Sequence, residues 1–277
     1  MKLQGKTAII TGGSRGIGKV IAEFFVREGA NVVIAARSLD ELKGAQAEMG
    51  QNGALGKIEI ASTDVSRKTD VRALVRKAVD RFGTVDILVN AAGVYGAIGT
   101  VAEVDLEKWK ATFDINLFGA VNVIQEVLPI FIEKKQGKII NFSGGGDGPL
   151  PHFSAYNTSK VAVARFTETL AEEVRGYGIS ANVVAPGPVN THILEDALDA
   201  GEKLVGKEMY AKLKKQKAEG GVSPEKAAEL CVFLASSDSD GLSGKLVSAV
   251  WDDWKSWDAA KMREIMNSNK FTIRRTS

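Results

Sequence analysis

Tyr156 and Lys160 are the residues of this sequence whose types and spacing best fit acid–base chemistry. They precede an apolar run, 161–166, and together with it predict a buried helix. Four residues apart on a helix, the two side chains lie about 6 Å apart, so an ammonium group can stand beside a phenol and favour its ionised form. A Tyr-x-x-x-Lys pair also occurs by chance on a half-exposed helix face, so the elements around it must decide between the two interpretations.

A glycine-rich loop near the N-terminus follows a short apolar run, 7–11, and precedes a helical pattern, 20–25. Gly12, Gly16 and Gly18 permit a tight turn and a close backbone approach. The N-terminus of the following helix offers amide donors and a positive dipole to a pyrophosphate. Strand, glycine loop and helix in this order predict a dinucleotide site, and the alternative is an ordinary strand-to-helix turn.

The residues after the second predicted strand, 31–35, bear on which dinucleotide would bind. An NAD-specific site places Asp or Glu about twenty residues past the glycines, to bind the ribose 2′-hydroxyl. Here Ala36 and Arg37 occupy that place, and Arg37 matches a 2′-phosphate better, although it could also be a solvated surface residue. Ser38 to Glu41 predicts a capping box that starts the next helix, and no acidic side chain is expected to repel the phosphate.

Composition excludes several classes of function. The 277 residues carry a formal charge of +2 with both signs interspersed, which is no signature of nucleic-acid or membrane binding. The single cysteine, Cys231, allows no internal disulfide and fits a reducing compartment. The N-terminus leads directly into a strand without an apolar segment, so a cytoplasmic protein is expected. No metal site is predicted.

Apolar strands alternate with helical patterns along the rest of the chain. Further strands are expected at 57–61, 87–89, 137–143, 179–185 and 245–250, and further helices at 71–82, 106–133, from 154 onward and at 224–235. This alternation, without a linker or a repeat, predicts an α/β fold: a single-domain, doubly wound parallel sheet, the Rossmann fold, over 1–277.

Three stretches within this pattern indicate particular structural or functional roles. Small residues in Asn90-Ala91-Ala92-Gly93, after the strand at 87–89, allow a flat ring or a ribose to approach, or simply fit close packing. Asn116 lies inside the predicted helix at 106–133, which indicates either a buried hydrogen bond or a kink. The polar, lysine-rich stretch at about 191–222 predicts a mobile helical excursion that forms a substrate loop, with an ordinary solvated segment as the alternative.

Taken together, these residues resemble the short-chain dehydrogenase/reductase family in its single-domain form, from about Lys6 to Val247. The motifs that carry the resemblance stand in the family's order and at its spacings. They are Thr11–Gly18, Asn90–Gly93, Asn116, Tyr156-x-x-x-Lys160 and Pro186-Gly187.

The resemblance implies roles for individual residues. Tyr156 would exchange the proton with the carbonyl oxygen, Lys160 would lower the Tyr156 pKa and hold the nicotinamide ribose, and Asn116 would support a water-linked proton path. Asp64 would meet the adenine, and Arg15 with Arg37 would go with NADP. The cofactor-binding residues implied are Gly12, Ser14, Arg15, Gly16, Ile17, Gly18, Arg37, Asp64, Val65, Asn90, Ala91, Gly93, Tyr156, Lys160, Pro186, Val189 and Thr191.

Two departures from the family pattern affect these expectations. The family's strand five usually ends Asn-x-Ser-Ser, and its second serine polarises the carbonyl thirteen positions before the tyrosine. Counting back from Tyr156 reaches Ser143, whereas counting forward from Asn141 reaches Gly144. Ser143 is the predicted catalytic serine, because Gly144 offers no side-chain donor. The second departure is Ser248–Trp254, which replaces the usual Asp-Gly-Gly.

The C-terminal extension, about 251–277, is rich in aromatic residues. Trp251, Trp254 and Trp257 recur every three residues, and Phe271 and Ile273 follow before Arg274-Arg275. Exposing so much aromatic surface is costly, so the extension is expected to pack against a partner subunit or the substrate pocket. The alternative is that it covers the open edge of the last strand within its own chain.

Three classes of function compete. The first is an NADPH-dependent carbonyl reductase or alcohol dehydrogenase acting on a small molecule, as a homodimer or homotetramer. The second is a non-catalytic NADP-binding sensor or scaffold of the same fold, which Tyr156 and Lys160 disfavour. The third is a nucleotide-sugar epimerase or dehydratase, disfavoured by the glycine spacing and the small substrate region.

Overall fold

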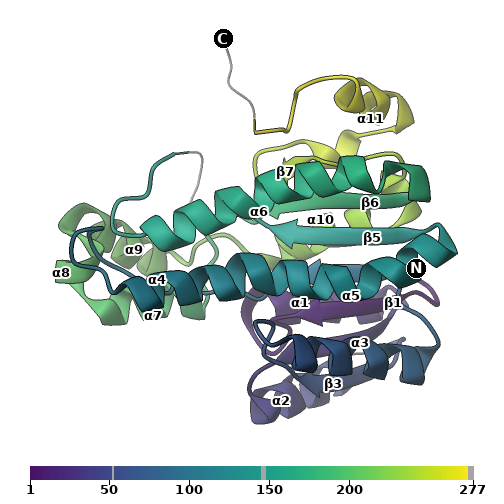
Figure 1. Cartoon of the computed structure of the whole chain (residues 1–277), viewed down its shortest axis with the longest axis horizontal. Coiled ribbons are helices and arrows are strands. Elements are labelled where there is room, and N and C mark those ends of the chain that lie inside the picture. The colour runs from purple at the N-terminus through teal and green to yellow at the C-terminus, as the bar shows by residue number, and fades with distance from the viewer. Residues whose placement is uncertain (52, 145–147, 274–277) are drawn as a thin grey trace.

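The computed structural model describes residues 1–51, 53–144 and 148–273, and its centre is one seven-stranded sheet (Figure 1). Every neighbouring pair of strands is parallel, in the order β3-β2-β1-β4-β5-β6-β7. The strands are β1 (Thr7–Thr11), β2 (Asn31–Ala36), β3 (Ile58–Ser62), β4 (Ile87–Asn90), β5 (Gly137–Phe142), β6 (Ile179–Ala185) and β7 (Leu246–Ser248). The chain builds outward from β1 to β3 and then returns to place β4 on the other side of β1. This reversal confirms the predicted doubly wound, single-domain fold and opens a crevice between the loops that follow β1 and β4.

Helices cover both faces of the sheet. One face carries α1 (Gly16–Arg27), α2 (Leu39–Gln51) and α10 (Pro224–Ala235); the other carries α3 (Lys68–Phe82), α5 (Gly119–Lys134) and α6 (Ser154–Glu173), which lie in front of the strands in Figure 1. Ile10 and Val89 belong to the first hydrophobic layer and Ile9 and Leu88 to the second, because successive strand residues point to opposite faces. Burial on both faces explains why the central strands are continuous apolar runs.

The helix expected at 106–133 is interrupted. It consists of α4 (Leu106–Phe113), a π-helical segment η1 (Asp114–Phe118) and α5. The whole stretch Leu106–Lys134 is long and apolar enough to cross a membrane by length and composition alone. It packs, however, against α3, α6 and the strands β4 and β5, as a core helix does.

A third hydrophobic cluster stands apart from the sheet and belongs to the predicted substrate loop. This region folds into α7 (His192–Ala200), α8 (Glu202–Val205) and α9 (Lys207–Glu219). Leu194, Val205 and Leu213 from these helices pack with Phe153, at the start of α6, and with the partly buried ring of Tyr156. The region therefore lies over the end of α6 that carries the candidate proton donor (Figure 1).

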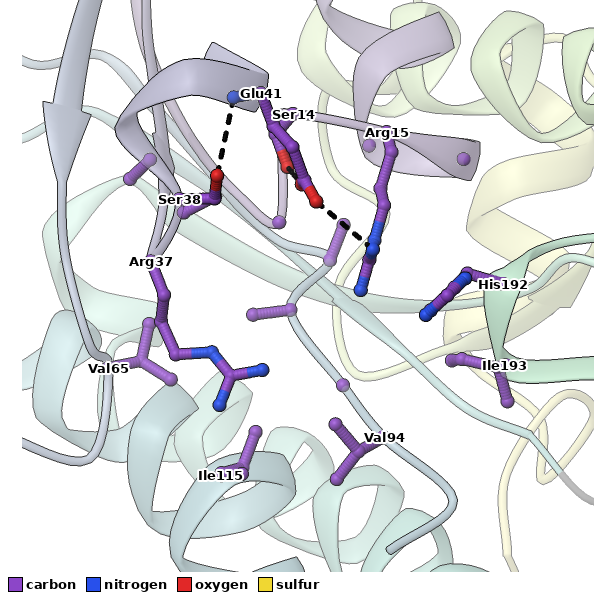
Figure 2. Close-up of a pocket in the computed structure, with 18 of the residues that line it drawn as sticks. Ser14, Arg15, Arg37, Ser38, Glu41, Val65, Val94, Ile115, His192 and Ile193 are labelled. Atoms are coloured by element: carbon purple, nitrogen blue, oxygen red, sulfur yellow. Dashed lines mark hydrogen bonds and ion pairs between the residues drawn. The ribbon is translucent and has the colours of Figure 1, made fainter. Parts of the chain in front are cut away.

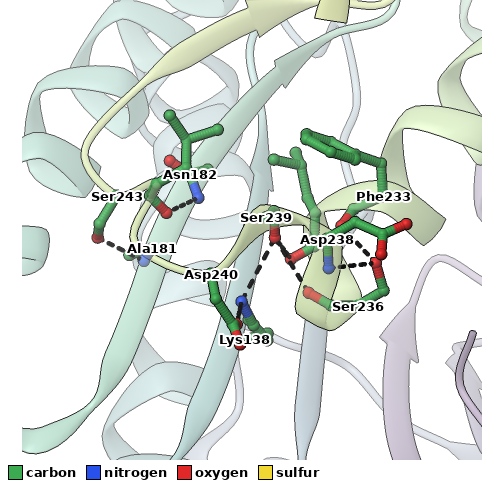
Figure 3. A network of polar contacts seen from close by, with 11 residues as sticks. Lys138, Ala181, Asn182, Phe233, Ser236, Asp238, Ser239, Asp240 and Ser243 are labelled. Carbon is green, nitrogen blue, oxygen red and sulfur yellow. Dashed lines mark hydrogen bonds and ion pairs between the residues drawn. The ribbon is translucent and has the colours of Figure 1, made fainter. Parts of the chain in front are cut away.

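Polar contacts fix the loop between α10 and β7 onto the neighbouring strands (Figure 3). The Lys138 ammonium of β5 donates to the Asp240 carboxylate at 2.7 Å, and the Asn182 amide of β6 donates to the carbonyl of Leu242 at 2.9 Å. The backbone amide of Ala181 donates to the Ser243 hydroxyl at 3.0 Å. These bonds hold the last strand in its place at the edge of the sheet.

The described part of the C-terminal extension packs within its own chain. The extension contains η4 (Trp254–Ser256) and α11 (Ala259–Met266). Trp254 of η4, Trp257 just after it and Ile265 of α11 are buried in the hydrophobic layer formed by α1 and α10. The carbonyl of Phe271 accepts a hydrogen bond from the amide of Leu246 at 2.8 Å, so the extension pairs with the open edge of β7. Trp251 is 70% exposed, contrary to the expectation that all three tryptophans pack. The residues Arg274-Arg275 lie outside the described part of the chain.

Trp254 and Trp251 form a matched pair for testing this packing. Trp254 is 6% exposed and its ring lies 5.5 Å from that of Phe233. Trp254→Ala is expected to lower the free energy of unfolding by about 3–5 kcal/mol, because it leaves a large cavity in a close-packed layer. Trp251→Ala should change it by less than about 0.5 kcal/mol. Chemical denaturation of both variants measures this, and equal stabilities would show that the extension does not contribute to the core.

Two short 3-10 segments complete the fold, η2 (Arg175–Tyr177) after α6 and η3 (Ser237–Ser239) after α10.

Candidate active site

Tyr156 lies in the first turn of α6, with its ring enclosed by aromatic and aliphatic side chains. The Tyr95 ring meets it edge-on, with the ring centroids 4.6 Å apart, and Tyr95 in turn packs on Phe153. Burial, and secondarily the nearby Tyr95 hydroxyl, raise the pKa of Tyr156 well above its ordinary value. The phenol is therefore held in its protonated form, which suits a proton donor.

Lys160 lies one helical turn after Tyr156 and is almost completely buried. Its ammonium group donates to the carbonyl of Phe142 at 3.2 Å, and burial lowers the pKa of Lys160 to about 8. The expectation that Lys160 lowers the pKa of Tyr156 is not met in this structure. Desolvation dominates at both groups and disfavours the charged form of each.

Gly144, rather than Ser143, lies beside the Tyr156 hydroxyl. A Cβ atom built on Gly144 would stand 2.0 Å from the Tyr156 Oη. The Ser143 hydroxyl instead donates to the carbonyl of Val184 on β6 at 3.4 Å. The structure thus differs from the prediction that placed Ser143 beside Tyr156. The loop that follows continues into residues 145–147, which lie outside the described residues.

Asn116 joins the end of β4 to α6. Its side-chain amide donates to the Val94 carbonyl and to the Ser159 hydroxyl, both at 3.0 Å, and its Oδ1 accepts from the Val94 amide at 2.9 Å. A Cβ atom on Gly93 would stand 3.3 Å from both the Asn116 Oδ1 and the Lys160 Nζ, so these two groups converge on Gly93. The buried hydrogen bonds expected for Asn116 are thus present, and Asn116 also lies in the π-helical segment η1.

A pocket of about 540 Å³ lies at the carboxyl end of the sheet, in the crevice between β1 and β4 (Figure 2). It contains most of the residues expected to bind a cofactor. These are Gly12, Ser14, Arg15, Gly16, Ile17, Gly18, Arg37, Asp64, Val65, Ala91, Gly93 and Thr191.

The remaining expected cofactor residues lie outside the pocket lining. Lys160 reaches the pocket at Gly93, and Tyr156 lies one helical turn before Lys160 on α6. Pro186 and the buried Val189 lie in the loop after β6. Asn90 is buried at the end of β4, where its amide donates to the Asn141 Oδ1 at 2.9 Å and supports the strand ends.

The glycine loop fits a pyrophosphate by its shape. Gly12 adopts a left-handed φ of +68°, and a Cβ atom there would stand 2.8 Å from the amide nitrogen of Ala92. A Cβ atom on Gly18 would stand 2.3 Å from the carbonyl oxygen of Gly12. Only glycine allows this approach, and it brings the N-terminus of α1, with its free amide donors, to the pocket. The donor set and the cradle therefore fit a dinucleotide.

Arg37 and Asp64 line the same end of the pocket. Burial acts to raise the pKa of Asp64, but hydrogen bonds from Ser66 and the charges of Arg37 and Arg67 outweigh it and hold that pKa below its ordinary value. The Ser66 hydroxyl donates to the Asp64 Oδ1 at 2.7 Å. Asp64 is thus an ionised acceptor at the place where an adenine is expected.

Glu41 in the first turn of α2 corrects the expectation that no acidic side chain faces the 2′-phosphate. The Ser38 hydroxyl accepts from the Glu41 amide at 3.3 Å, as a helix cap does. The Glu41 carboxylate, however, accepts from the Ser14 hydroxyl at 2.9 Å and pairs with Arg15 at 3.2 Å (Figure 2). The signal available in the sequence was that β1 and β2 are neighbours in a doubly wound sheet, so the loops that follow them lie side by side.

Beyond the predicted Thr191, the start of α7 adds pocket residues that were not predicted from the sequence. His192, Ile193 and Asp196 line the pocket, and Figure 2 shows His192 across from Arg15. The His192 Nε2 lies 3.2 Å from the Asp196 carboxylate. The helices over Tyr156 therefore also reach the dinucleotide pocket, which links the two halves of the site.

Sequence and structure comparisons agree with this geometry. Residues 6–201 match the short chain dehydrogenase family. The 3-oxoacyl-[acyl-carrier-protein] reductase of Thermotoga maritima is 33% identical over 89% of this chain and 97% of its own. Among solved structures, an actinorhodin polyketide ketoreductase variant with NADPH has a TM-score of 0.79 at 29% identity, over 88% of this chain and 95% of that one. An NAD⁺-bound xylitol dehydrogenase has a TM-score of 0.79 at 26% identity, over 90% and 98%.

The fold and the site therefore define a nicotinamide-dependent oxidoreductase built on a doubly wound sheet. The chain belongs to the short-chain dehydrogenase/reductase family.

Proposed function

We propose that this protein is an NADP(H)-dependent oxidoreductase that transfers a hydride between the nicotinamide and a carbonyl or secondary alcohol, with Tyr156 as general acid or base. The observation that carries the proposal is the convergence of Asn116 and Lys160 on Gly93. Gly93 lines the dinucleotide pocket, and Lys160 and Tyr156 lie one turn apart on α6. A partly buried proton donor thus lies one helical turn from a lysine that reaches the dinucleotide cradle.

Each group of residues in the site would have its own role in binding and catalysis. The N-terminus of α1 would hold the pyrophosphate and Asp64 would meet the adenine, and a bound nicotinamide supplies or accepts the hydride. During reduction, Tyr156 would donate its proton to the carbonyl oxygen. Lys160 would hold the nicotinamide ribose, and Asn116 would connect the site to a water-linked proton path. The hydrophobic cluster around Tyr156 would exclude bulk water.

The same cluster favours an apolar carbonyl substrate. Leu194 of α7, Val205 of α8 and Met209 of α9 belong to the hydrophobic cluster that packs with Tyr156. We expect ketones, keto-acyl thioesters and quinones to be reduced faster than sugars, because the cluster offers a sugar few partners for its hydroxyl groups.

A screen of NADPH oxidation against ketones, keto-acyl thioesters, quinones and sugars tests the reaction. NADPH oxidation that depends on the carbonyl compound would support the proposal. NADPH binding without turnover on any class would favour the alternative, a non-catalytic NADP-binding sensor or scaffold.

We expect the protein to prefer NADPH to NADH. Arg15 and Arg37 line the pocket and offer charge-assisted contacts to a 2′-phosphate. We expect NADPH to bind at least about tenfold more tightly than NADH, since one such contact contributes roughly 1.5–3 kcal/mol. Fluorescence titration of both reduced cofactors measures this, and equal dissociation constants would contradict it.

The proposal extends to the setting in which the protein works. We propose a cytoplasmic homodimer or homotetramer that acts on a small molecule and needs neither nucleic acid nor a membrane. Light scattering on the purified protein measures the assembly. A monomer at micromolar concentration would contradict that part of the proposal.

A further inference from the structure

We propose that Glu41 sets how strongly this site discriminates between NADPH and NADH, by competing with the 2′-phosphate for Ser14 and Arg15. The inference rests on the proposed cofactor and concerns a residue for which the sequence predicted only a capping role. It assigns a specificity-determining function to the first turn of α2.

The contacts of Glu41 carry the argument. Its two carboxylate oxygens accept separate hydrogen bonds, one from the Ser14 hydroxyl at 2.9 Å and one from Arg15 at 3.2 Å. Both donors belong to the glycine loop, and all three residues line the pocket. A phosphate group next to this loop would seek the same hydroxyl and guanidinium donors.

The charges at this end of the pocket are balanced. Arg15 has Glu41 as its partner, and Arg37 acts electrostatically on Asp64. Asp196 lines the pocket as well, so its carboxylates at least match its two arginines, and the pocket attracts a doubly negative phosphate less than the arginines alone would. If the Glu41 carboxylate stays in place, it repels the phosphate. If it moves away, Ser14 and Arg15 become free to bind the phosphate.

The exposure of the pair makes such an exchange feasible. The Arg15 and Glu41 side chains are 49% and 41% exposed, so water can take over the contacts when the two separate. Surface pairs of this kind are weak, and Glu41 can turn away toward solvent at little cost to the fold. The expected effect is therefore a moderate penalty on NADPH binding and not a block.

Glu48 provides a matched control on the same helix. Its carboxylate pairs with Lys19 and so links α2 to α1, much as Glu41 links α2 to the glycine loop. Glu48 is absent from the lining of the pocket. Glu48→Gln therefore removes one α2 carboxylate and one ion pair without touching the cofactor site.

The test titrates NADPH and NADH into the wild type, Glu41→Gln and Glu48→Gln by fluorescence. Glu41→Gln should bind NADPH about fivefold to tenfold more tightly, or roughly 1–1.4 kcal/mol, because one like charge next to the phosphate is removed. Binding of NADH should change by less than about twofold, because NADH presents no phosphate to this place. Glu48→Gln should match the wild type for both cofactors.

A double variant, Glu41→Gln with Arg15→Gln, tests whether Glu41 acts through the glycine-loop donors. If Glu41 acts by holding Arg15 and Ser14, the gain of Glu41→Gln should largely disappear when Arg15→Gln is also present. Weaker NADH binding by Glu41→Gln would overturn the inference and show that Glu41 accepts from the ribose hydroxyl. Unchanged binding of both cofactors would overturn it as well. A wild type that binds neither cofactor would refute the proposed function itself, so the two failures are distinguishable.

Discussion

Tyr156→Phe is expected to lower turnover about a hundredfold to ten-thousandfold, the usual loss when a positioned general acid is removed. Phenylalanine keeps the ring that packs edge-on against Tyr95 and deletes only the hydroxyl, so the fold and the hydrophobic cluster should persist. Cofactor affinity should change little, because Tyr156 lies outside the lining of the dinucleotide pocket. Steady-state kinetics with the best substrate of the carbonyl screen, together with NADPH titration, measures both quantities.

Tyr177→Phe is the control for that experiment. Tyr177 lies in η2 after the far end of α6 and is largely exposed, so removing its hydroxyl should leave turnover at the parental level. A Tyr156→Phe variant as active as the parent would refute Tyr156 as the proton donor. Loss of NADPH binding in that variant would instead indicate a role in holding the cofactor.

Gly144→Ala is expected to lower turnover about a hundredfold, the cost of misplacing a catalytic group by roughly 1 Å. The new methyl group would stand 2.0 Å from the Tyr156 Oη, well inside any allowed contact, so the phenol must move. Gly144 does not use the left-handed region, so alanine fits its backbone. NADPH binding should persist, because Gly144 is not part of the pocket lining. The same kinetics and titration check this.

Gly148→Ala is the matched control in the same loop. No described atom lies within 4 Å of a Cβ atom built there, so the methyl group should be accommodated and turnover kept. Parental turnover in Gly144→Ala would mean that Tyr156 works from a position away from Gly144. A similar loss in both variants would point to the loop as a whole and not to the Tyr156 contact.

The fold could be predicted from the sequence because the local signals for helices and strands agree with the arrangement of the whole sheet. The helix at 224–235 and the strand at 179–185 begin and end where the pattern predicted, since Pro224 starts the helix and glycines or prolines flank the strand. The strand at 245–250 is shorter in the structure, β7 being Leu246–Ser248. Its last predicted residues leave the ladder in a turn in which the Ser248 hydroxyl accepts from the Trp251 amide at 3.1 Å.

The residues of the site were predictable where only one residue type can meet the structural or chemical requirement. Glycines at 12 and 18 and the pair Tyr156 and Lys160 lie where their spacing placed them, because backbone sterics and helical geometry leave few alternatives. The residue that lies beside the Tyr156 hydroxyl was not predictable, because it depends on a loop whose length sets the register between β5 and α6. Glu41 was missed because its partners, Ser14 and Arg15, lie far away along the sequence.

The placement of Trp254, Trp257 and Ile265 in the layer of α1 and α10 affects how the chain matures during synthesis. That layer joins Leu3 and Ile21 to side chains that are synthesised much later. A nascent chain that ends before Trp254 would show the outer side of α10, including Phe233, to solvent, and β7 would lack its Phe271 partner. Because domains fold as units, final packing of this face must wait until the residues up to Ile265 have been synthesised, and until then the chain presents an apolar face for chaperones to bind.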